Sequence, residues 1–262
     1  MDIMVEDIAK YIEQIAPKYL MEDWDNSGFL VGNKNEKVSG IIVALDITQD
    51  VIKQAKKAGA NMIVSHHPVI FNPIKEITNE NNSIIYELIT NGINAYCAHT
   101  TLDNAQGGVN DYLANKLELK DTLVLEEYKE GQGTGRIGLL KRNMDAQELA
   151  AFVKQRLEAE YIRYADAGNT IKKVAVVGGS GASFIDKAID CGADALITGD
   201  IKHHDVLYCL EKGLTIIDAT HFATEQIVKD RIFSHLQSQL NKVQYSIALL
   251  KADEIDNMRI LV

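Results

Sequence analysis

The chain has 262 residues, 46% of them hydrophobic, and a formal net charge of −10; this length suits one large α/β domain or two domains of roughly 100–150 residues each. The acidic balance disfavours nonspecific binding to nucleic acid or to an anionic membrane, because both are polyanions. Three widely spaced cysteines without a C-x-x-C pair, together with the lack of a signal-peptide pattern or of an apolar run of about 20 residues, predict a reduced, cytoplasmic protein.

The first part of the chain alternates helical and strand patterns. Helical spacing of Val5, Ile8, Ile12 and Ile15 predicts an opening helix. The expected elements in chain order are a helix over 4–16, a strand over 40–45, a helix over 49–58, a strand over 61–65, a helix over 83–90, a strand over 93–98 and a helix over 109–117. This alternation indicates βαβ units and a largely parallel sheet.

The middle of the chain changes character and is followed by a second α/β stretch. Glycines and alternating residues over 121–143 predict hairpin-like strands. The later elements are expected to be a helix over 145–159, a strand over 173–177, a helix over 183–190, a strand over 195–198, a helix over 206–212, a strand over 214–217 and a long helix over 222–240.

The two α/β stretches resemble each other. The first has KKAGANMIVSHHP where the second has IDCGADALITGDIKHHD, and it then has NGINAYCAHTTLD where the second has EKGLTIIDATHFATE. Both place polar residues just past strand ends, where open parallel sheets bind ligands. We therefore expect an α/β fold of two similar domains with mainly parallel or mixed sheets, one over 1–125 and one over 126–262. The alternative is a chance likeness between two ordinary βα units.

An adjacent histidine pair, His66 and His67, follows the expected strand 61–65 and precedes Pro68. Successive side chains of an extended chain point to opposite sides, and Pro68 keeps His67 out of the helical region. Two neighbours held in this way suit two metal ions on either side of the strand end better than one shared ion. A buried histidine pair satisfied by backbone carbonyls is the alternative.

A histidine and an acid four residues later follow a strand in both halves, as His99 with Asp103 and as His221 with Glu225. At the start of a helix these spacings place both side chains on one face, so imidazole and carboxylate converge. Such ligands suit zinc, iron or manganese. A single match of this kind is more often an ion pair or a solvated face, but two matches beside a histidine pair predict a metal site.

Three other features are open to more than one interpretation. Gly133-x-Gly135-x-x-Gly138 fits the dinucleotide-binding string, but an apolar strand pattern follows where a helix should begin, so we interpret it as turn chemistry. The glycines over 178–181 predict a tight turn, with a phosphate cradle as the alternative. The polar run over 200–205 is expected to position other groups, with a separate metal site as the alternative.

These residues, together with EDWDNSGFLVG (22–32), ALDIT (44–48), GQGTGRIG (131–138) and LITGD (196–200), resemble the NIF-three-like family, whose members are often called GTP cyclohydrolase I type 2 homologues. The resemblance covers essentially the whole chain and is to the short form without an inserted domain. It implies two interlinked α/β domains with a dinuclear metal site between them, and a hexameric ring.

Carried over residue by residue, the family's ligand positions fall on His66, His67, Asp103, His221 and Glu225. The resemblance thus implies two divalent transition-metal ions per chain, of zinc, iron or manganese. His99 matches a polar residue beside the centre. The internal symmetry alone would make His99 a ligand; following the family, we expect it to have a catalytic or positioning role.

The function that these expectations favour is a metal-dependent hydrolase acting on a nucleotide or another phosphorylated or heterocyclic small molecule. The alternative is a non-catalytic metal-binding or partner-regulating protein. Polar residues beyond those needed for coordination favour catalysis, and Asn26, Asp200 and His204 are expected to position other groups or to contact substrate. Two nearby cations also need an anionic ligand between them. We expect Glu225 to bridge, with His67 and Asp103 completing one ion and His66 and His221 the other.

Overall fold

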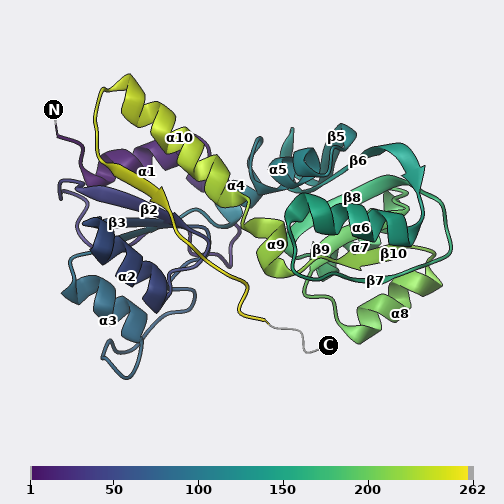
Figure 1. Ribbon diagram of the computed structural model, residues 1–262, viewed down its shortest axis with the longest axis horizontal. Helices are drawn as coiled ribbons and strands as arrows, with labels where there is room; N and C mark the ends of the chain where they lie inside the picture. The colour runs from purple at the N-terminus through teal and green to yellow at the C-terminus, as the bar shows by residue number, and fades with distance from the viewer. Residues whose placement is uncertain (1, 259–262) are drawn as a thin grey trace. The chain divides into compact units, whose positions relative to one another are not determined.

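The computed structural model describes residues 2–258; residues 1 and 259–262, at the outer ends of the two predicted domains, lie outside the described part. The chain forms two compact units (Figure 1). Unit 1 comprises Met1–Ala105 and Val228–Ile255, and unit 2 comprises Gln106–Ile227 and Asp256–Val262. The boundaries of these units differ from the predicted domain boundary between residues 125 and 126. That point falls inside strand β5 (Lys120–Lys129), which pairs along its length with a neighbouring strand of unit 2.

Unit 1 contains a five-stranded sheet in the order β1-β4-β3-β2-β11. Its strands are β1 (Gly28–Val31), β2 (Gly40–Ala44), β3 (Met62–Ser65), β4 (Asn94–Cys97) and β11 (Ala248–Lys251). Its helices are α1 (Val5–Glu13), η1 (Lys18–Leu20), α2 (Gln49–Ala58), α3 (Ser83–Thr90), α4 (Thr100–Asp103) and α10 (Val228–Lys242). Neighbouring strands from β11 to β4 are parallel, and only β1 of this sheet is antiparallel to its neighbour.

The central strands of unit 1 are buried on both faces. Every residue of β2, β3 and β4 is buried, which explains why they appear in the sequence as continuous apolar runs. Ile42 and Ile63 pack with Ile52 of α2 and Leu88 of α3 on one face of the sheet. The parallel arrangement brings the carboxyl ends of β2, β3 and β4 to one edge, where the polar residues of SHHP and HTTLD follow.

Unit 2 contains a six-stranded sheet in the order β5-β6-β8-β9-β10-β7. Its other strands are β6 (Gln132–Met144), β7 (Arg163–Ala165), β8 (Ile171–Ser180), β9 (Ala195–Gly199) and β10 (Thr215–Asp218). Its helices are α5 (Val109–Lys116), α6 (Ala146–Leu157), η2 (Ala182–Phe184), α7 (Ile185–Asp190), α8 (His203–Glu211) and α9 (His221–Glu225). Strands β8, β9 and β10 are parallel, whereas β5, β6 and β7 pair antiparallel with their neighbours.

Alternate residues of β8 divide the core of unit 2 into two layers. Val174 and Val176 belong to a cluster with side chains of α5 and α6, whereas Ala175 and Val177 belong to a cluster with side chains of α7 and α8. Side chains of a strand point alternately to the two faces of its sheet. Helices therefore cover both faces, as Figure 1 shows. The glycine-rich string over 133–138 lies in strand β6, so it is not a dinucleotide-binding turn, and its interpretation as turn chemistry was also wrong.

The two units share a topological core, in agreement with the likeness of the two sequence stretches. Each has three consecutive parallel strands, β2-β3-β4 in unit 1 and β8-β9-β10 in unit 2. In each, a short antiparallel strand pairs with the last of the three, β1 with β4 and β7 with β10. The fold is thus a mixed α/β fold with two sheets.

The largest differences between the sequence prediction and the structure are at one long helix and three short strands; in addition, η1 was not expected, and the helix expected over 183–190 is η2 followed by α7. The helix expected over 222–240 is two helices, α9 and α10, with a turn at residues 226 and 227. Apolar periodicity persists across this break because both helices bury apolar side chains, α9 in unit 2 and α10 in unit 1. Strands β1, β7 and β11 were not expected; they lie at sheet edges and are only partly buried, whereas the equally short β3, β4 and β10 are fully buried.

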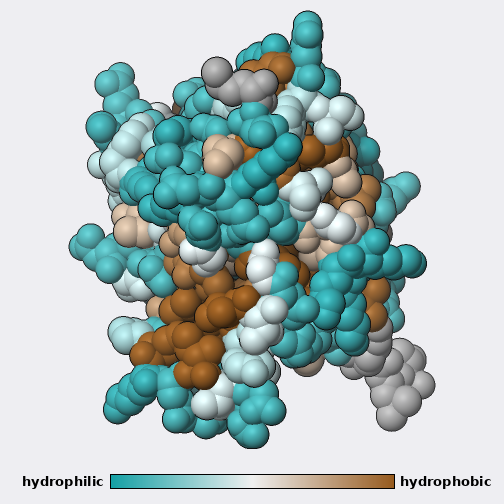
Figure 2. All heavy atoms as spheres, turned by 90° about the vertical axis from the view of Figure 1, so that its left-hand side faces the viewer, coloured by the Kyte–Doolittle hydropathy of each residue, from teal (hydrophilic) through white to brown (hydrophobic). Residues whose placement is uncertain are grey.

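The surface is mixed in character. The face shown in Figure 2 is hydrophilic over most of its area, with a patch of hydrophobic side chains at the lower left and smaller ones toward the top. Unit 1 has an apolar cavity of about 500 Å³ whose lining includes Ile77, Ile85 and Ile89. Among residues 2–258, no helix is both long and apolar enough to cross a lipid bilayer.

Candidate metal centre

Three histidines of unit 1 converge at the carboxyl ends of β3 and β4. His66 and His67 directly follow β3, and His99 is the residue before α4. The ring centroids are 5.0 Å apart for His66 and His67, 5.3 Å for His66 and His99, and 5.6 Å for His67 and His99. One ring nitrogen of each lies within 4.8 Å of one from each of the others. This spacing would allow the three side chains to hold a metal ion.

The hydrogen bonds of these rings determine which nitrogen carries the proton. Nδ1 of His66 lies 3.0 Å from the carbonyl oxygen of Ala98, and Nδ1 of His67 lies 2.8 Å from Oδ1 of Asp46. A carbonyl or carboxylate oxygen only accepts, so Nδ1 carries the hydrogen and donates it. Nε2 of each ring then carries the lone pair. This arrangement is typical of metal-binding histidines, whose second nitrogen is held by an acceptor.

Asp103 of α4 faces the buried ring of His66. Its Oδ1 lies 3.5 Å from Nε2 of His66, whose side chain is fully buried. A neutral Nε2 with a lone pair and a carboxylate oxygen are both acceptors, so their proximity away from water is favourable only with a cation or an added proton between them. The donor chemistry of the pair therefore fits a metal ion.

Asp25 orients the ring of His99. Its fully buried carboxylate accepts hydrogen bonds from Nδ1 of His99 (2.8 Å), Oγ of Ser27 (2.6 Å) and Oγ1 of Thr100 (2.5 Å). Burial by itself raises the pKa of Asp25, but the hydrogen bonds from His99, Ser27 and Thr100 together hold that pKa well below its usual range. Asp25 is therefore a carboxylate, and it leaves Nε2 of His99 with the lone pair.

Asn26 has a structural contact that explains its place in the motif. Its Nδ2 donates to the carbonyl oxygen of Ile70 at 2.7 Å, which ties the segment before β1 to the loop after His67. Asn26 was predicted to position other groups or to contact substrate. In unit 1 its amide nitrogen positions the loop.

Unit 2 contributes a second histidine and carboxylate pair on α9. Nε2 of His221 lies 2.8 Å from Oε2 of Glu225, one helical turn later. Nδ1 of His221 lies 2.7 Å from Oδ2 of Asp200, which follows β9. Asp200 thus accepts the Nδ1 proton and directs Nε2 toward Glu225, in the way that Asp46 orients His67 in unit 1.

The residues that present this pair have unusual backbone conformations. Thr220 has φ +66° and Asp200 has φ +58°, both in the region that side chains other than glycine rarely adopt. Thr220 also caps α9, since its Oγ1 accepts from the backbone N–H of Ala223 at 3.1 Å. Strain of this kind costs roughly 1–3 kcal/mol and concentrates at functional sites.

Two glycines make room for the pair. A Cβ on Gly179 would clash with Oε1 of Glu225 and lie 3.1 Å from Nε2 of His221, and a Cβ on Gly199 would lie 2.5 Å from the backbone nitrogen of His221. The backbone N–H of Gly178 donates to Asn110, and that of Gly179 donates to Thr224. Gly179 and Gly199 therefore allow close approach of the site residues, and the hydrogen-bonded N–H groups of Gly178 and Gly179 disfavour a phosphate cradle. Gly178 and Gly179 lie in strand β8, so the tight turn predicted there was wrong for these two residues.

The remaining histidines and the cysteines lie in other settings. His204 is exposed in the first turn of α8, with its ring centroid 6.3 Å from that of His203. Nε2 of His235 donates to the carbonyl oxygen of Tyr11 at 2.8 Å, and burial lowers its pKa, so it is a packing histidine. Burial also raises the pKa of Cys97, and raises that of Cys209 to about 11, which disfavours either thiol as a nucleophile.

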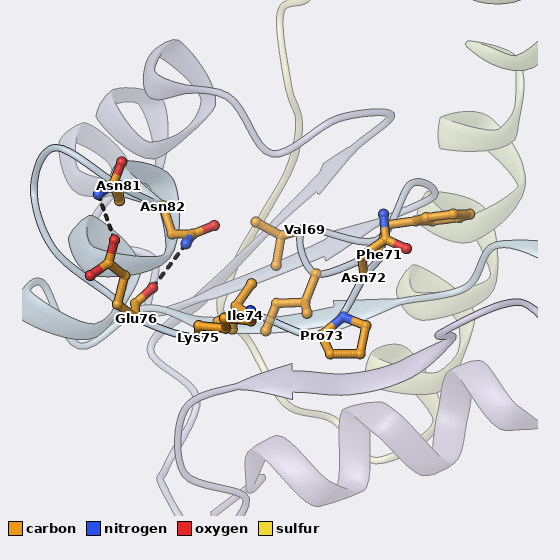
Figure 3. A pocket seen from close by; sticks show the side chains of 10 residues that line it. Val69, Phe71, Asn72, Pro73, Ile74, Lys75, Glu76, Asn81 and Asn82 are labelled. Carbon is orange, nitrogen blue, oxygen red and sulfur yellow. Dashed lines mark hydrogen bonds between the residues drawn. The ribbon is translucent and has the colours of Figure 1, made fainter.

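A polar cavity of about 570 Å³ is formed by the loop that follows the histidine pair of unit 1. Figure 3 shows that Glu76, Asn81 and Asn82 gather at one end and that Phe71 lies at the other. Nδ2 of Asn81 donates to Oε1 of Glu76 at 2.6 Å, and Nδ2 of Asn82 donates to the Glu76 carbonyl oxygen at 2.9 Å. These amide groups therefore shape the loop.

Each unit thus assembles part of the expected site. Unit 1 brings together His66, His67, His99 and Asp103, and unit 2 brings together His221, Glu225 and Asp200. The carboxylates Asp25 and Asp46 were not predicted as site residues. Both lie in segments that carry the resemblance, EDWDNSGFLVG and ALDIT, and Asp46 lies two residues after the end of the buried strand β2, where site residues are often found.

The chain is similar to known proteins over most of its length. The model of the family described as Duf34/NIF3 (NGG1p interacting factor 3) matches residues 3–257. A protein of Clostridium perfringens named GTP cyclohydrolase 1 type 2 homolog is 38% identical over 242 residues, covering 90% of this chain and 92% of that protein. A protein of Clostridium acetobutylicum with the same name is 36% identical over 256 residues, covering 95% and 96%.

A solved structure shows the same fold. The crystal structure of a Bacillus cereus protein related to NIF3 superposes with a TM-score of 0.94 at 25% sequence identity. The match covers 100% of both chains. The arrangement of two sheets is therefore shared over the full length.

Proposed function

This chain belongs to the Duf34/NIF3 family, and we propose that it is a metal-dependent hydrolase acting on a nucleotide or another phosphorylated or heterocyclic small molecule. The observation that carries the proposal is the repeated presentation of a histidine Nε2 to a carboxylate. His66 faces Asp103 at 3.5 Å in unit 1, and His221 faces Glu225 at 2.8 Å in unit 2. In each unit an acceptor holds Nδ1, so the histidines are prepared to bind a cation.

We propose that two divalent transition-metal ions, of zinc, iron or manganese, are held by His66, His67, Asp103, His221 and Glu225. The nitrogen and oxygen donors suit any of these metals. The distance between His66 and Asp103 supports their binding to the same ion, in place of the pairing of His67 with Asp103 expected from the sequence. Bound ions would polarise the electrophile and lower the pKa of a bound water to near 7.

His99 is proposed to move the proton. Asp25 accepts the Nδ1 hydrogen of His99, which fixes the tautomer and leaves Nε2 to take a proton from water or to return it to the leaving group. The buried charge of Asp25 would also stabilise the imidazolium that forms. One ring nitrogen of His99 lies within 4.8 Å of His66 and His67, so the group would act close to their ligand atoms.

The alternative is a non-catalytic metal-binding or partner-regulating protein. Both functions need the ligands, but only catalysis needs a further oriented proton acceptor. His99 with its buried partner Asp25 therefore favours the hydrolase. The relatives' name suggests GTP as a first compound to assay.

The test is a turnover screen of metal-loaded protein against nucleotides and other phosphorylated compounds, with His99→Ala beside the parent protein. We expect His99→Ala to retain both metals and to lose roughly 10²- to 10⁴-fold in rate, as for loss of a general base. His235→Gln is the matched control, since that histidine packs against Tyr11 within unit 1. No turnover of any compound by the parent protein would favour the non-catalytic alternative.

We also propose that the protein is a homo-oligomer and that the oligomer is a hexameric ring, an inference supported only by the family resemblance. Light scattering at micromolar concentration tests it. A mass of one chain would remove the proposal.

A further inference from the structure

We propose that Trp24 and Phe71 form a platform on which a planar heteroaromatic ring, such as a nucleobase, stacks when a small molecule binds beside His99. The inference rests on the proposed function in placing the small molecule at the histidines of unit 1. It adds the chemical class of the ligand and the residues that select it. Trp24, Phe71 and His99 all belong to unit 1.

The two aromatic side chains are exposed beside the histidine cluster. Trp24 is 59% exposed and Phe71 is 48% exposed, although large aromatic residues usually bury most of their surface. Their ring centroids are 5.9 Å apart. The ring of His99 is 5.8 Å from Trp24 and 6.4 Å from Phe71, edge-on to both. The exposed rings are therefore in contact with a histidine to which we assign proton transfer.

The spacing determines where a ligand ring can lie. A ring inserted between two others needs about 7 Å between their planes, two contacts of roughly 3.5 Å each. Trp24 and Phe71 are closer than that and are inclined by 44°. A planar ligand therefore stacks on an exposed outer face, most favourably that of the larger Trp24, with Phe71 bracing the indole. Offset stacking of this kind is the preferred geometry of aromatic pairs.

Hydrogen bonds hold the platform in place before any ligand binds. Asn26, two residues after Trp24, donates to the carbonyl oxygen of Ile70, directly before Phe71. Asp25, directly after Trp24, accepts the Nδ1 hydrogen of His99. Figure 3 shows the Phe71 ring pointing away from the end of the cavity where Glu76 lies. One short hydrogen bond thus holds the ring of His99 and the other ties together the segments that carry Trp24 and Phe71, which reduces the entropy lost on binding.

A small ring fits this setting better than a protein partner. A protein-binding surface needs a contiguous apolar patch of several hundred Å². The apolar cavity of unit 1, lined by Ile77, Ile85 and Ile89, has neither Trp24 nor Phe71 in its lining. The platform instead adjoins the ring of His99, whose centroid lies 5.3 Å from that of His66 and 5.6 Å from that of His67. An apolar face beside a few oriented polar groups is the usual character of a small-molecule site.

Trp24 gives the test a direct readout, because it is the only tryptophan of the chain. Zinc-reconstituted protein is titrated with guanosine monophosphate and with cytidine monophosphate, and ribose 5-phosphate serves as the probe without a ring. We expect both nucleotides to quench Trp24 fluorescence, after correction for their absorption, and ribose 5-phosphate to leave it unchanged. Quenching by neither nucleotide would overturn the proposal.

Variants separate stacking from other contacts, with affinity measured by equilibrium dialysis because some lack the fluorophore. Trp24→Leu should bind guanosine monophosphate about tenfold more weakly or worse, whereas Trp24→Phe, which keeps an aromatic face, should recover most of the affinity. Phe71→Leu should show a smaller loss. Tyr86→Leu, an exposed aromatic on α3, is the matched control and should bind normally. Unchanged affinity in Trp24→Leu would overturn the platform.

The outcomes distinguish this inference from the proposed function. Nucleotide binding that depends on Trp24, without turnover of any compound, would contradict the hydrolase and leave the platform standing. Turnover whose KM and kcat are the same in Trp24→Leu and in the parent protein would contradict the platform and leave the hydrolase standing.

Discussion

The two units orient a histidine with a carboxylate in the same way, but they support that carboxylate differently. In unit 1, Asp25 is fully buried beneath His99 and accepts further hydrogen bonds from Ser27 and Thr100. In unit 2, the side chain of Asp200, which accepts the Nδ1 hydrogen of His221, is 53% exposed. One orienting group is therefore part of the packed interior, and the other lies at the surface.

In unit 2, backbone conformation and close packing position the site residues instead. Asp200 and Thr220 have positive φ angles, and Gly179 and Gly199 allow a carboxylate and a helix start to approach the strands closely. A related strand topology thus supports comparable chemistry by two means, hydrogen bonds to a buried charge in one unit and close steric fit in the other. This difference predicts which substitutions affect metal binding and which affect folding.

The largest effect is expected from Glu225→Gln. This substitution keeps the shape of a buried side chain that lies 2.8 Å from His221 and removes its charge. If Glu225 bridges two ions, metal affinity should fall roughly 100-fold or more at both positions. Elemental analysis after dialysis gives the metal content.

Two comparisons sharpen that result. Asp103→Asn and His221→Ala should each deplete mainly one ion, since each removes a ligand of one ion only. Glu211→Gln, at the exposed end of α8, should keep both. Two tightly held metals in Glu225→Gln would show that another group bridges the ions.

A smaller effect is expected from Gly179→Ala. The new methyl group would clash with the Glu225 carboxylate, so we expect metal affinity to fall about tenfold, in addition to about 1–2 kcal/mol of stability lost to the left-handed backbone. Gly213→Ala is the control, because Gly213 has φ +74° and open space where a Cβ would be. It should lose the same stability and no metal affinity. Equal metal affinities in the two variants would contradict the steric explanation.

Asp25→Asn is expected to have the smallest effect on metal content. It should reduce folding stability more than Asp200→Asn does. Loss of the buried charge and of well-matched acceptors should reduce the free energy of unfolding by roughly 2–3 kcal/mol. Asp200→Asn, where the carboxylate is exposed, should cost less than about 1 kcal/mol. Urea unfolding of both variants at neutral pH measures the difference, and equal losses would contradict the comparison.

The same pair of variants differs in pH dependence. The pKa of Asp25 is below that of the unfolded chain, so its contribution is fully present above the unfolded value of about 3.9 and declines as the pH falls toward the folded pKa. Below about pH 4, the parent protein should therefore lose stability faster than Asp25→Asn. An identical decline in both would show that Asp25 does not carry this linkage.

Most of the regular structure could be predicted from the sequence. The strands over 40–45, 61–65 and 93–98 and the helices over 49–58 and 83–90 were expected within one residue of their observed ends. They are long or apolar enough for local periodicity to identify them, and capping residues such as Thr48 mark their ends. The break between α9 and α10 and the short edge strands could not be predicted, because they depend on partners distant in the sequence.

The sequence by itself determined the mixed α/β class, the internal repeat and the histidine and acid motifs, since these depend on local spacing. Only the tertiary structure decided which acceptor holds each Nδ1. Asp25 meets His99 across 74 residues, and Asp46 meets His67 across 21. It also decided that Gly179 makes room for Glu225 and that Trp24 lies against Phe71. Such contacts follow from how the strands of each sheet align side by side, and no periodicity along the chain records that alignment.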